Sequence, residues 1–531
     1  MRGELMAGSG LSGTSWCDRI PLFHFTSALL LLFLVSPAVG FLLGVNPPLP
    51  LLENFQSVIQ QNAFSGILVL FLLAIPACVF FTRGMKLPAV VRALSLISRK
   101  TGHRLSPIIG WIRRCNGWLQ ALPFGKYLFG LVLLTFLLRF TWILLVPTVP
   151  RSDFMVYHTV AIQVSSLFST DPGQIYFGMR ALTFELVLGA LYRLAGADPI
   201  VAKISNVFLS IAFVLLMFGL ARYSLDEQTA RIAALLSALL PSQIMMTSIV
   251  ASEHLFTVLI LLSLFMIVKG VVQDPAGYTW LLGAGLILGI AYTVRFIAVA
   301  VFLAVLVYLI CANDRAIKAS VIRVIPFVAG FLIVFSTLSM LILVTHTPPL
   351  PTQGFEYSFL TGTNVTGSGA YNPEVVAQFN SWSPQSARHQ ALMAGVRQIT
   401  DSPVQFCVLL LKKVDIMWGG DYIAVYWAGF NDTPSGLQPV LPMTALVVLA
   451  LISQGYYMGL LLLGAVGAYW LSRSAPRKDL YVYPLILITI FMVHSLLEVQ
   501  QRYHFPFEFV IIILSAFALS RIMENHLPED N

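Results

Sequence analysis

The run VIPFVAGFLIVFSTLSMLILV at residues 324–344 contains no charged side chain. An α-helix rises about 1.5 Å per residue, so about 20 apolar residues of this kind cross the roughly 30 Å hydrocarbon core of a bilayer. Further uncharged apolar runs at residues 28–44, 64–81 and 211–220 are separated by polar breaks. Transmembrane β-strands would instead show short segments of alternating polarity. The pattern predicts a helical protein that crosses the membrane many times.

The composition of the whole chain agrees with this prediction. Of the 531 residues, 57% are hydrophobic and 11% are charged, and the mean hydropathy is +0.82. A soluble domain could not keep so much apolar surface away from water. The net charge of +8 comes from basic residues that gather in loops. This placement favours contact with anionic lipid headgroups over a nucleic-acid partner.

The basic residues also indicate the orientation of the chain. Residues 83–126 contain no acidic side chain and carry nine basic ones: Arg83, Lys86, Arg92, Arg99, Lys100, Arg104, Arg113, Arg114 and Lys126. By the positive-inside rule this segment is cytoplasmic. Counting spans in both directions from it, we expect an all-α polytopic fold with about 12 transmembrane helices and both termini in the cytoplasm.

This topology divides the chain into four expected parts. Residues 1–126 hold two N-terminal spans and the basic cytoplasmic loop. Residues 127–346 form a transmembrane core with outer loops that are candidates for catalysis. Residues 347–443 form a large region on the non-cytoplasmic side, and residues 444–531 hold three spans and a short cytoplasmic tail.

Two outer segments have a more specific prediction. Residues 153–168 and 182–195 combine helical periodicity with charged side chains, which is typical of helices lying at the membrane interface. Residues 355–369 are rich in glycine and threonine. We expect them to form a mobile lid or acceptor loop, with a simple flexible connection as the alternative.

Several kinds of site have no signal in the sequence. The five cysteines lie without paired or metal-ligand spacing, so we expect no disulfide framework and no zinc site. No phosphate-binding glycine loop, kinase signature or HExxH motif is present. The glycines at 283–289 lie within an expected span, where small residues favour helix packing. We expect no cofactor, and no metal site is indicated.

Two acidic residues are expected on the same outer face. Asp153 follows the span that ends near residue 146, and Glu253 follows the span that ends near residue 247. A carboxylate in a half-dry outer cavity is suited to take a proton from an acceptor hydroxyl. Together the two could instead orient an acceptor or hold a divalent ion. The alternative for Asp153 is an ordinary loop acid paired with Arg151.

Cationic residues are expected beside these acids. Arg295 lies at an outer turn between two apolar spans, and Arg502 precedes the last span. Forked hydrogen bonds from a guanidinium group suit an anionic headgroup, above all a phosphate. Snorkelling to the interface is the alternative for both. His158 and His504 are weaker candidates, because a single histidine is more often structural.

The order of these residues resembles a known family. The motifs are Ser152-Asp153-x3-Tyr157-x3-Ala161, Ser252-Glu253-x-Leu255-Phe256, Ala291-Tyr292-Thr293-Val294-Arg295 and Gln501-Arg502-Tyr503-x2-Pro506. Over about residues 127–521 the chain resembles the polytopic glycosyltransferases of the GT-C fold. The group in question is related to dolichyl-phosphate-mannose protein mannosyltransferases and to bacterial aminoarabinose and lipopolysaccharide-core transferases.

The resemblance implies an inverting membrane glycosyltransferase. It would move a sugar from a polyprenyl-phosphate donor to a glycan or lipid acceptor, at the periplasmic or outer face of a bacterial inner (plasma) membrane. The implied catalytic residues are Asp153 and Glu253. The implied substrate-binding residues are Tyr157, His158, Arg295, Arg502, Tyr503 and His504. Ser152 stands where the protein mannosyltransferases have a second adjacent acid, which argues against a protein acceptor.

Two other functions are compatible with many spans and outer cations. A transporter or flippase for lipid-linked glycans usually has interrupted spans or charges at mid-membrane in matching halves. In this sequence the charges gather at one face, with Arg139 as the main exception. An O-antigen-type polymerase would share the substrates and a large outer loop. Both functions stay open at the level of sequence.

Overall fold

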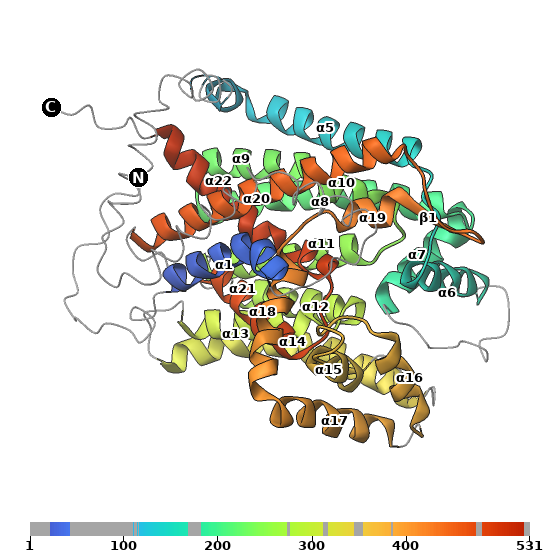
Figure 1. Cartoon of the computed structure of the whole chain (residues 1–531). Helices are drawn as coiled ribbons and strands as arrows, with labels where there is room; N and C mark the ends of the chain where they lie inside the picture. The colour runs from blue at the N-terminus through green and yellow to red at the C-terminus, as the bar shows by residue number, and fades with distance from the viewer. Residues whose placement is uncertain are drawn as a thin grey trace.

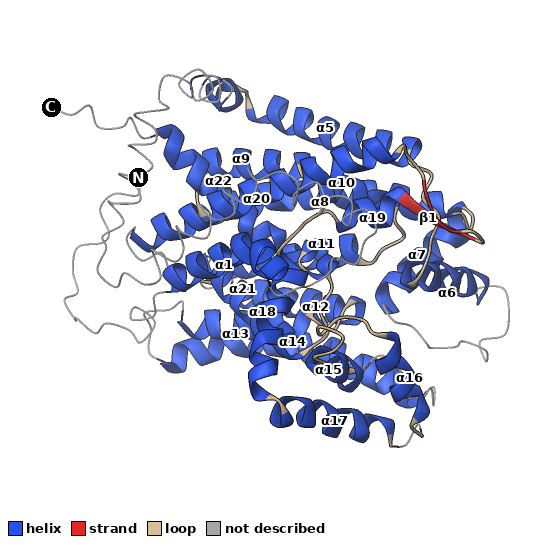
Figure 2. Ribbon diagram, in the orientation of Figure 1, coloured by secondary structure: helices blue, strands red, loops and turns tan. Residues whose placement is uncertain are grey.

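The computed structural model describes residues 22–42, 110, 114 and 116–524. Within the last of these ranges it does not describe residues 168–181, 273–276, 312–316, 345–353, 384–385 and 474–479. Helices make up most of the described chain, and the only strands in these ranges are the antiparallel pair β1 and β2 (Figure 2). The predicted all-α class is therefore confirmed.

The helices and the two strands follow one another along the chain in two groups, separated by residues 345–354. From residue 22 to 344 they are α1 (Leu22–Leu42), α5 (Phe124–Leu145), α6 (Asp153–Leu167), α7 (Leu182–Ala195), α8 (Pro199–Ser224), α9 (Glu227–Leu239), α10 (Pro241–Met245), η3 (Met246–Ser248), α11 (Glu253–Val272), α12 (Gly277–Val294), α13 (Ala298–Cys311) and α14 (Ile317–Val344). From residue 355 they are α15 (Phe355–Thr363), α16 (Pro373–Ser381), α17 (Ala387–Asp401), α18 (Pro403–Trp418), α19 (Ile423–Gly429), β1 (Phe430–Thr433), β2 (Gly436–Pro439), α20 (Met443–Arg473), α21 (Val482–Leu496), η6 (Gln501–Tyr503), η7 (Phe505–Phe507) and α22 (Glu508–Glu524).

The expected count of 12 transmembrane helices is not confirmed. Among the described residues, six helices are long and apolar enough to cross a membrane, or seven if the bent pair α9 and α10 is one span. Four shorter apolar helices accompany them, including residues 321–337 within α14. The apolar run at residues 64–81, one of the two N-terminal spans that we expect, lies outside the described residues. The chain is thus a membrane protein with several spans.

Arg139, the charged residue within an expected span, stabilises the break between α9 and α10. Its guanidinium group is fully buried and donates hydrogen bonds to the carbonyl oxygens of Ala238 (2.8 Å) and Ser237 (3.3 Å). The last carbonyls of a helix have no partner within the helix and attract a cation. The chain bends by 51° at this point, where Pro241 begins α10. The buried charge therefore has a structural partner.

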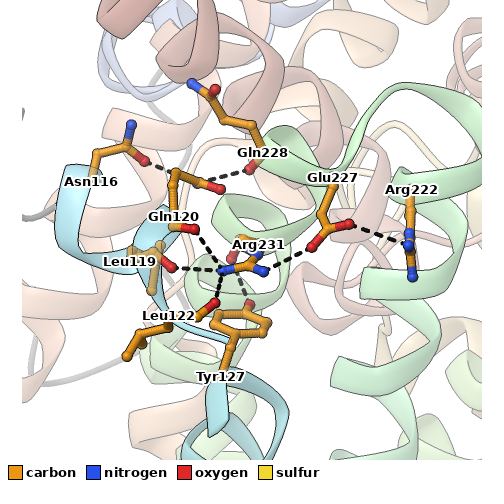
Figure 3. Close-up of polar contacts among 9 residues, drawn as sticks. All are labelled: Asn116, Leu119, Gln120, Leu122, Tyr127, Arg222, Glu227, Gln228 and Arg231. Carbon is orange, nitrogen blue, oxygen red and sulfur yellow. Dashed lines mark hydrogen bonds and ion pairs between the residues drawn. The ribbon is translucent and has the colours of Figure 1, made fainter. Parts of the chain in front are cut away.

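A second arginine joins the beginnings of α5 and α9 at the end of the molecule that we expect to be cytoplasmic. Figure 3 shows Arg231 donating to the carbonyl oxygens of Leu119 (2.8 Å), Gln120 (3.2 Å) and Leu122 (2.9 Å). Its other terminal nitrogen lies 2.8 Å from Glu227. Because one guanidinium satisfies three carbonyls, it fixes the segment that leads into α5.

The two helices predicted for the first outer loop are present as α6 and α7. They pack against each other at one end of the molecule, close to β1 (Figure 1). A side chain at Gly189 in α7 would collide with Val164 in α6, so glycine permits this close contact. The observed bounds, 153–167 and 182–195, agree with the predicted ones.

Two of the glycines predicted to serve helix packing, Gly285 and Gly289, lie at the contact between α12 and α14. A Cβ atom at Gly285 would meet the backbone oxygen of Phe327, and one at Gly330 would meet the backbone oxygen of Leu282. Small residues at both positions let the two helix backbones approach closely, as in many membrane proteins. The interface therefore depends on the absence of side chains at these two positions.

The variant Gly285→Ala is expected to lower the stability of the purified protein by about 1–3 kcal/mol, because the methyl group forces two backbones apart. Thermal unfolding in detergent measures the change. Gly283→Ala is the matched control, because a Cβ atom there meets only the mobile end of Met266. Equal destabilisation by both variants would contradict the proposed backbone contact.

The region from α15 to α17, which we expect on the non-cytoplasmic side, is docked onto the transmembrane part. Residues 355–363, expected to belong to a lid or a flexible loop, form helix α15 and pack against α17 around Leu360, Phe379 and Ala391. Backbone hydrogen bonds join Glu498 N to Ser358 O (2.8 Å) and Val499 N to Gly369 O (2.9 Å). Residues 355–369 are therefore held against the segment that follows α21.

Lys413 of α18 reinforces this docking. Its buried ammonium group donates to the carbonyl oxygens of Gly362 (2.8 Å) and Ser495 (2.9 Å). Burial lowers the pKa of Lys413 from its ordinary value of 10.5 to about 7, although Glu498 acts in the opposite direction. The buried amine can donate both hydrogen bonds without its charge.

Stability should consequently rise with pH. Because the pKa of Lys413 is lower in the folded than in the unfolded chain, the unfolded chain binds the extra proton between pH 7 and 10.5. We expect a gain of about 1 kcal/mol per pH unit above pH 7. Denaturation of the wild type and of Lys413→Gln at pH 7, 8 and 9 tests this. The same dependence in both proteins would rule out Lys413 as its origin.

Candidate functional site

Asp153 begins helix α6 directly after a strained residue. Ser152 has a φ of 53°, in the left-handed region that residues other than glycine rarely adopt. The chain turns there, and the amide of Phe154 donates to the carbonyl oxygen of Arg151. The carboxylate of Asp153 then lies 2.6 Å from Nη2 of Arg502, with 27% of the acid's side chain exposed. Residues far apart in sequence form this ion pair.

Arg151, the alternative partner of Asp153, is directed to α19. Its Nη2 donates to the carbonyl oxygen of Tyr426 (2.8 Å), and its guanidinium lies over the rings of Tyr426 and Trp427. Its Nη1 lies 3.7 Å from the exposed carboxylate of Asp432. Arg151 therefore anchors the segment before α6, while Arg502 contacts Asp153.

Glu253 and Arg295 form a second ion pair. Glu253 begins α11 and is fully buried, and its Oε1 lies 2.7 Å from Nη1 of Arg295, which follows the end of α12. The same nitrogen lies 3.4 Å from Oγ of Ser252. The other carboxylate oxygen of Glu253 is buried without a hydrogen-bond partner among the described residues. A buried carboxylate depends strongly on its cation, so the pair is expected to act as a unit.

Aromatic rings connect the two ion pairs. The guanidinium of Arg295 lies 5.5 Å from the centre of the Tyr503 ring, and that of Arg502 lies 5.9 Å from the same ring. Burial raises the pKa of Tyr157, on which the charges of all four residues of the two ion pairs also act. We call Asp153, Glu253, Arg295 and Arg502, with Tyr157 and Tyr503, the arginine–carboxylate cluster.

The two arginines retain unused donors. Nε of Arg502 donates to Gln500 Oε1 (2.9 Å), and Gln500 in turn donates to Glu498 (2.8 Å). No hydrogen bond within the described residues involves Nη1 of Arg502 or Nη2 of Arg295. Guanidinium groups present their donors in a planar fork that fits a phosphate or carboxylate. The cluster is therefore able to receive an anion.

The two histidines lie outside this cluster. Nδ1 of His158 lies 2.7 Å from the hydroxyl group of Tyr192 in α7, and burial lowers the pKa of His158. His504 is fully buried, and its ring nitrogens face Met417, Asp421 and Glu508. A substrate-binding role for these histidines stays a prediction.

Some residues of the site were not identified from the sequence. Gln500 and Glu498 extend the cluster through Arg502, and the ring of Phe154 lies 5.2 Å from its guanidinium. Gln500 stands two residues before Arg502 in the chain, which is the only local signal for its role. Trp427, by contrast, is an aromatic residue for which the sequence predicts sugar stacking or interfacial anchoring, and its ring lies 4.5 Å from the guanidinium of Arg151 and 5.6 Å from that of Arg502.

The fold and the cluster define a helical membrane protein with several spans and a partly buried arginine–carboxylate site. The site joins the beginnings of α6 and α11 to the turns before α13 and α22. A family model described as "Dolichyl-phosphate-mannose-protein mannosyltransferase" matches residues 180–341, which include Glu253 and Arg295. The resemblance to the mannosyltransferase group is thereby confirmed for this part of the chain. No curated protein sequence gives a significant match.

Solved structures with a similar chain path include two from different organisms. One is an archaeal oligosaccharyltransferase, AglB from Archaeoglobus fulgidus, in complex with an inhibitory peptide and a dolichol-phosphate, with 15% identity, a TM-score of 0.44, and coverage of 75% of this chain and 50% of that one. The other is ArnT from Cupriavidus metallidurans bound to undecaprenyl phosphate, with 12% identity, a TM-score of 0.36, and coverage of 75% and 79%. The chain thus spans about half the length of AglB. Both TM-scores are low and indicate a distant likeness.

Proposed function

We propose that the protein is an inverting glycosyltransferase that moves a sugar from a polyprenyl-phosphate donor to a glycan or lipid acceptor. The observation that carries the proposal is the meeting of Arg295 and Arg502 with Asp153 and Glu253 in one partly buried cluster. The match to the mannosyltransferase family over residues 180–341 supports the same chemistry. The reaction would take place at the non-cytoplasmic face, which is periplasmic if the source is a bacterium.

The arginines would bind the phosphate of the donor. A lipid phosphate lies at headgroup level, where the interfacial helices α6 and α7 are expected to lie. Each arginine is already oriented by a carboxylate, and each has at least one donor nitrogen without a partner among the described residues. When the bond between the sugar and the phosphate breaks, negative charge grows on the phosphate. Cations fixed beforehand stabilise that charge more in the transition state than in the ground state.

Asp153 would act as the general base. The acceptor hydroxyl group attacks the anomeric carbon, and the bond from that carbon to the phosphate oxygen breaks with its electron pair leaving on the phosphate. The hydroxyl proton passes to the Asp153 carboxylate, whose 27% exposure leaves it accessible to an acceptor. Attack opposite to the leaving group inverts the configuration of the anomeric carbon.

Glu253 would act mainly through Arg295. It is fully buried, and its Oε1 contacts the guanidinium at 2.7 Å. Glu253 therefore fixes the orientation of the guanidinium group that would bind the phosphate. Tyr157 and Tyr503 would line the same site, since Tyr503 lies beneath both guanidinium groups and Tyr157 is buried beside all four charges.

Reconstitution tests the proposal directly. The full-length protein is placed in liposomes with a polyprenyl-phosphate sugar radiolabelled in the sugar, together with a candidate lipid or glycan acceptor. We expect the label to move to the acceptor with release of polyprenyl phosphate. Movement of intact donor across the bilayer without release of polyprenyl phosphate would support a flippase and overturn the proposal. A product that grows by many repeat units would instead identify a polymerase.

A further inference from the structure

A second buried group of polar side chains lies apart from the arginine–carboxylate cluster. It consists of Asp421 between α18 and α19, His504 between η6 and η7, and Glu508 at the start of α22. All three side chains are at most 1% exposed, and their candidate ligand atoms lie within 4.8 Å of one another. Buried charged groups need partners, so two ionised carboxylates at this place require a source of positive charge.

The environment of His504 determines which ring nitrogen faces the acids. Nδ1 lies 2.6 Å from the carbonyl oxygen of Met417, and because a carbonyl only accepts, Nδ1 carries a proton and donates it. Nε2 then points at Asp421 Oδ1 (3.4 Å) and Glu508 Oε1 (3.3 Å). Within the described residues, Nε2 and Glu508 Oε1 are buried without a hydrogen-bond partner.

The outer oxygens of the two carboxylates have other contacts. Gln243 donates to Glu508 Oε2 (3.2 Å), and Ser453 lies 3.3 Å from Asp421 Oδ2. The amide of Asp421 donates to Gln454 (2.9 Å). Such secondary contacts orient ligands toward a metal ion. Each acid thus presents one oxygen to the space shared with Nε2.

We propose that Asp421, His504 and Glu508 bind one divalent transition-metal ion of the Zn²⁺ class. Imidazole and carboxylate are suitable ligands for Zn²⁺, and ligand atoms about 2.0–2.1 Å from a tetrahedral ion lie about 3.3–3.4 Å from each other. The two distances from Nε2 agree with that spacing. The two positive charges of the ion also balance the two carboxylates. Three protein ligands leave a fourth position for water.

The ion would position Arg502. His504 follows Arg502 by two residues, and Glu508 begins the last helix. A metal that joins both to Asp421 fixes the turn that carries the Arg502 guanidinium toward Asp153. The metal site would therefore act on the arginine–carboxylate cluster only through the position of Arg502, without contact with the donor.

Metal analysis of the full-length protein in detergent tests the site. The protein is stripped with EDTA, dialysed, and titrated separately with ZnCl2 and MnCl2, and bound metal is measured by mass spectrometry with thermal unfolding in parallel. We expect about one equivalent of metal and a raised melting temperature in the wild type. Metal affinity should fall at least ~10-fold in His504→Gln and Glu508→Gln. His494→Gln, which changes a buried histidine outside the group, should bind as the wild type does.

Two results would overturn the proposal. One is that the stripped wild type neither binds these ions nor gains stability from them. The positive charge in the group would then come from a proton shared among the three side chains. The other is equal binding by the wild type and both glutamine variants, which would place the ion elsewhere. If the variants do not fold, X-ray absorption of the zinc-loaded wild type decides. A first shell of oxygens and one imidazole supports the site, and a shell with sulfur or without imidazole excludes it.

Discussion

Asp153→Asn is expected to lower the rate of sugar transfer by about 10²–10⁴-fold while leaving donor binding within about threefold of the wild type. Asparagine cannot take a proton from the acceptor hydroxyl. Its amide oxygen can still accept the hydrogen bond that Arg502 donates to Asp153 Oδ2 in the wild type. Single-turnover transfer measures the loss of rate, and equilibrium binding of a labelled polyprenyl-phosphate sugar measures donor binding.

The matched control for this variant is Asp432→Asn. Asp432 is also an acid near an arginine, but it is 61% exposed and lies 3.7 Å from Arg151. We expect close to wild-type transfer from this control. Undiminished transfer by Asp153→Asn would remove Asp153 as the base. A parallel loss of donor binding would show that Asp153 acts through the position of Arg502.

Arg295→Met should have the second large effect. Loss of its guanidinium is expected to weaken binding of the donor by about 100-fold, which corresponds to about 2.7 kcal/mol and is typical of a charged hydrogen bond to phosphate. It also leaves Glu253 fully buried without its cation, which should lower stability by about 3–5 kcal/mol. A loss of activity in this variant alone would therefore have two explanations.

The double variant Arg295→Met with Glu253→Gln separates them. Replacing the carboxylate by a neutral amide removes the unpaired buried charge, so the melting temperature should recover much of its loss. Donor affinity should remain low, because the guanidinium group that binds the phosphate is still missing. Acceptor binding should be nearly unchanged. Recovery of donor affinity in the double variant would mean that Arg295 contributes only to folding.

The helical class and the position of many spans follow from the sequence alone. The apolar runs, the glycines at 283–289 and the helices at 153–167 and 182–195 are local features, and hydropathy and periodicity detect local features. The shortage of charged residues inside spans also made Arg139 visible as an exception. Its partners, the carbonyls at the end of α9, are 98 and 99 residues away and are not visible in any local pattern.

In the candidate site, too, the sequence shows local features and the tertiary structure decides the distant contacts. From the sequence we expect these acids and arginines at or near span ends, since ionised groups avoid the hydrocarbon core. Only the tertiary structure decided that Asp153 contacts Arg502, 349 residues later, rather than Arg151, and that Glu253 contacts Arg295. It also decided that Tyr503 lies under the arginines while His504, the next residue, faces Asp421 and Glu508. The physical reason is that burial preference is a property of each residue, whereas the choice of partner depends on how α6, α11, α12 and α22 pack.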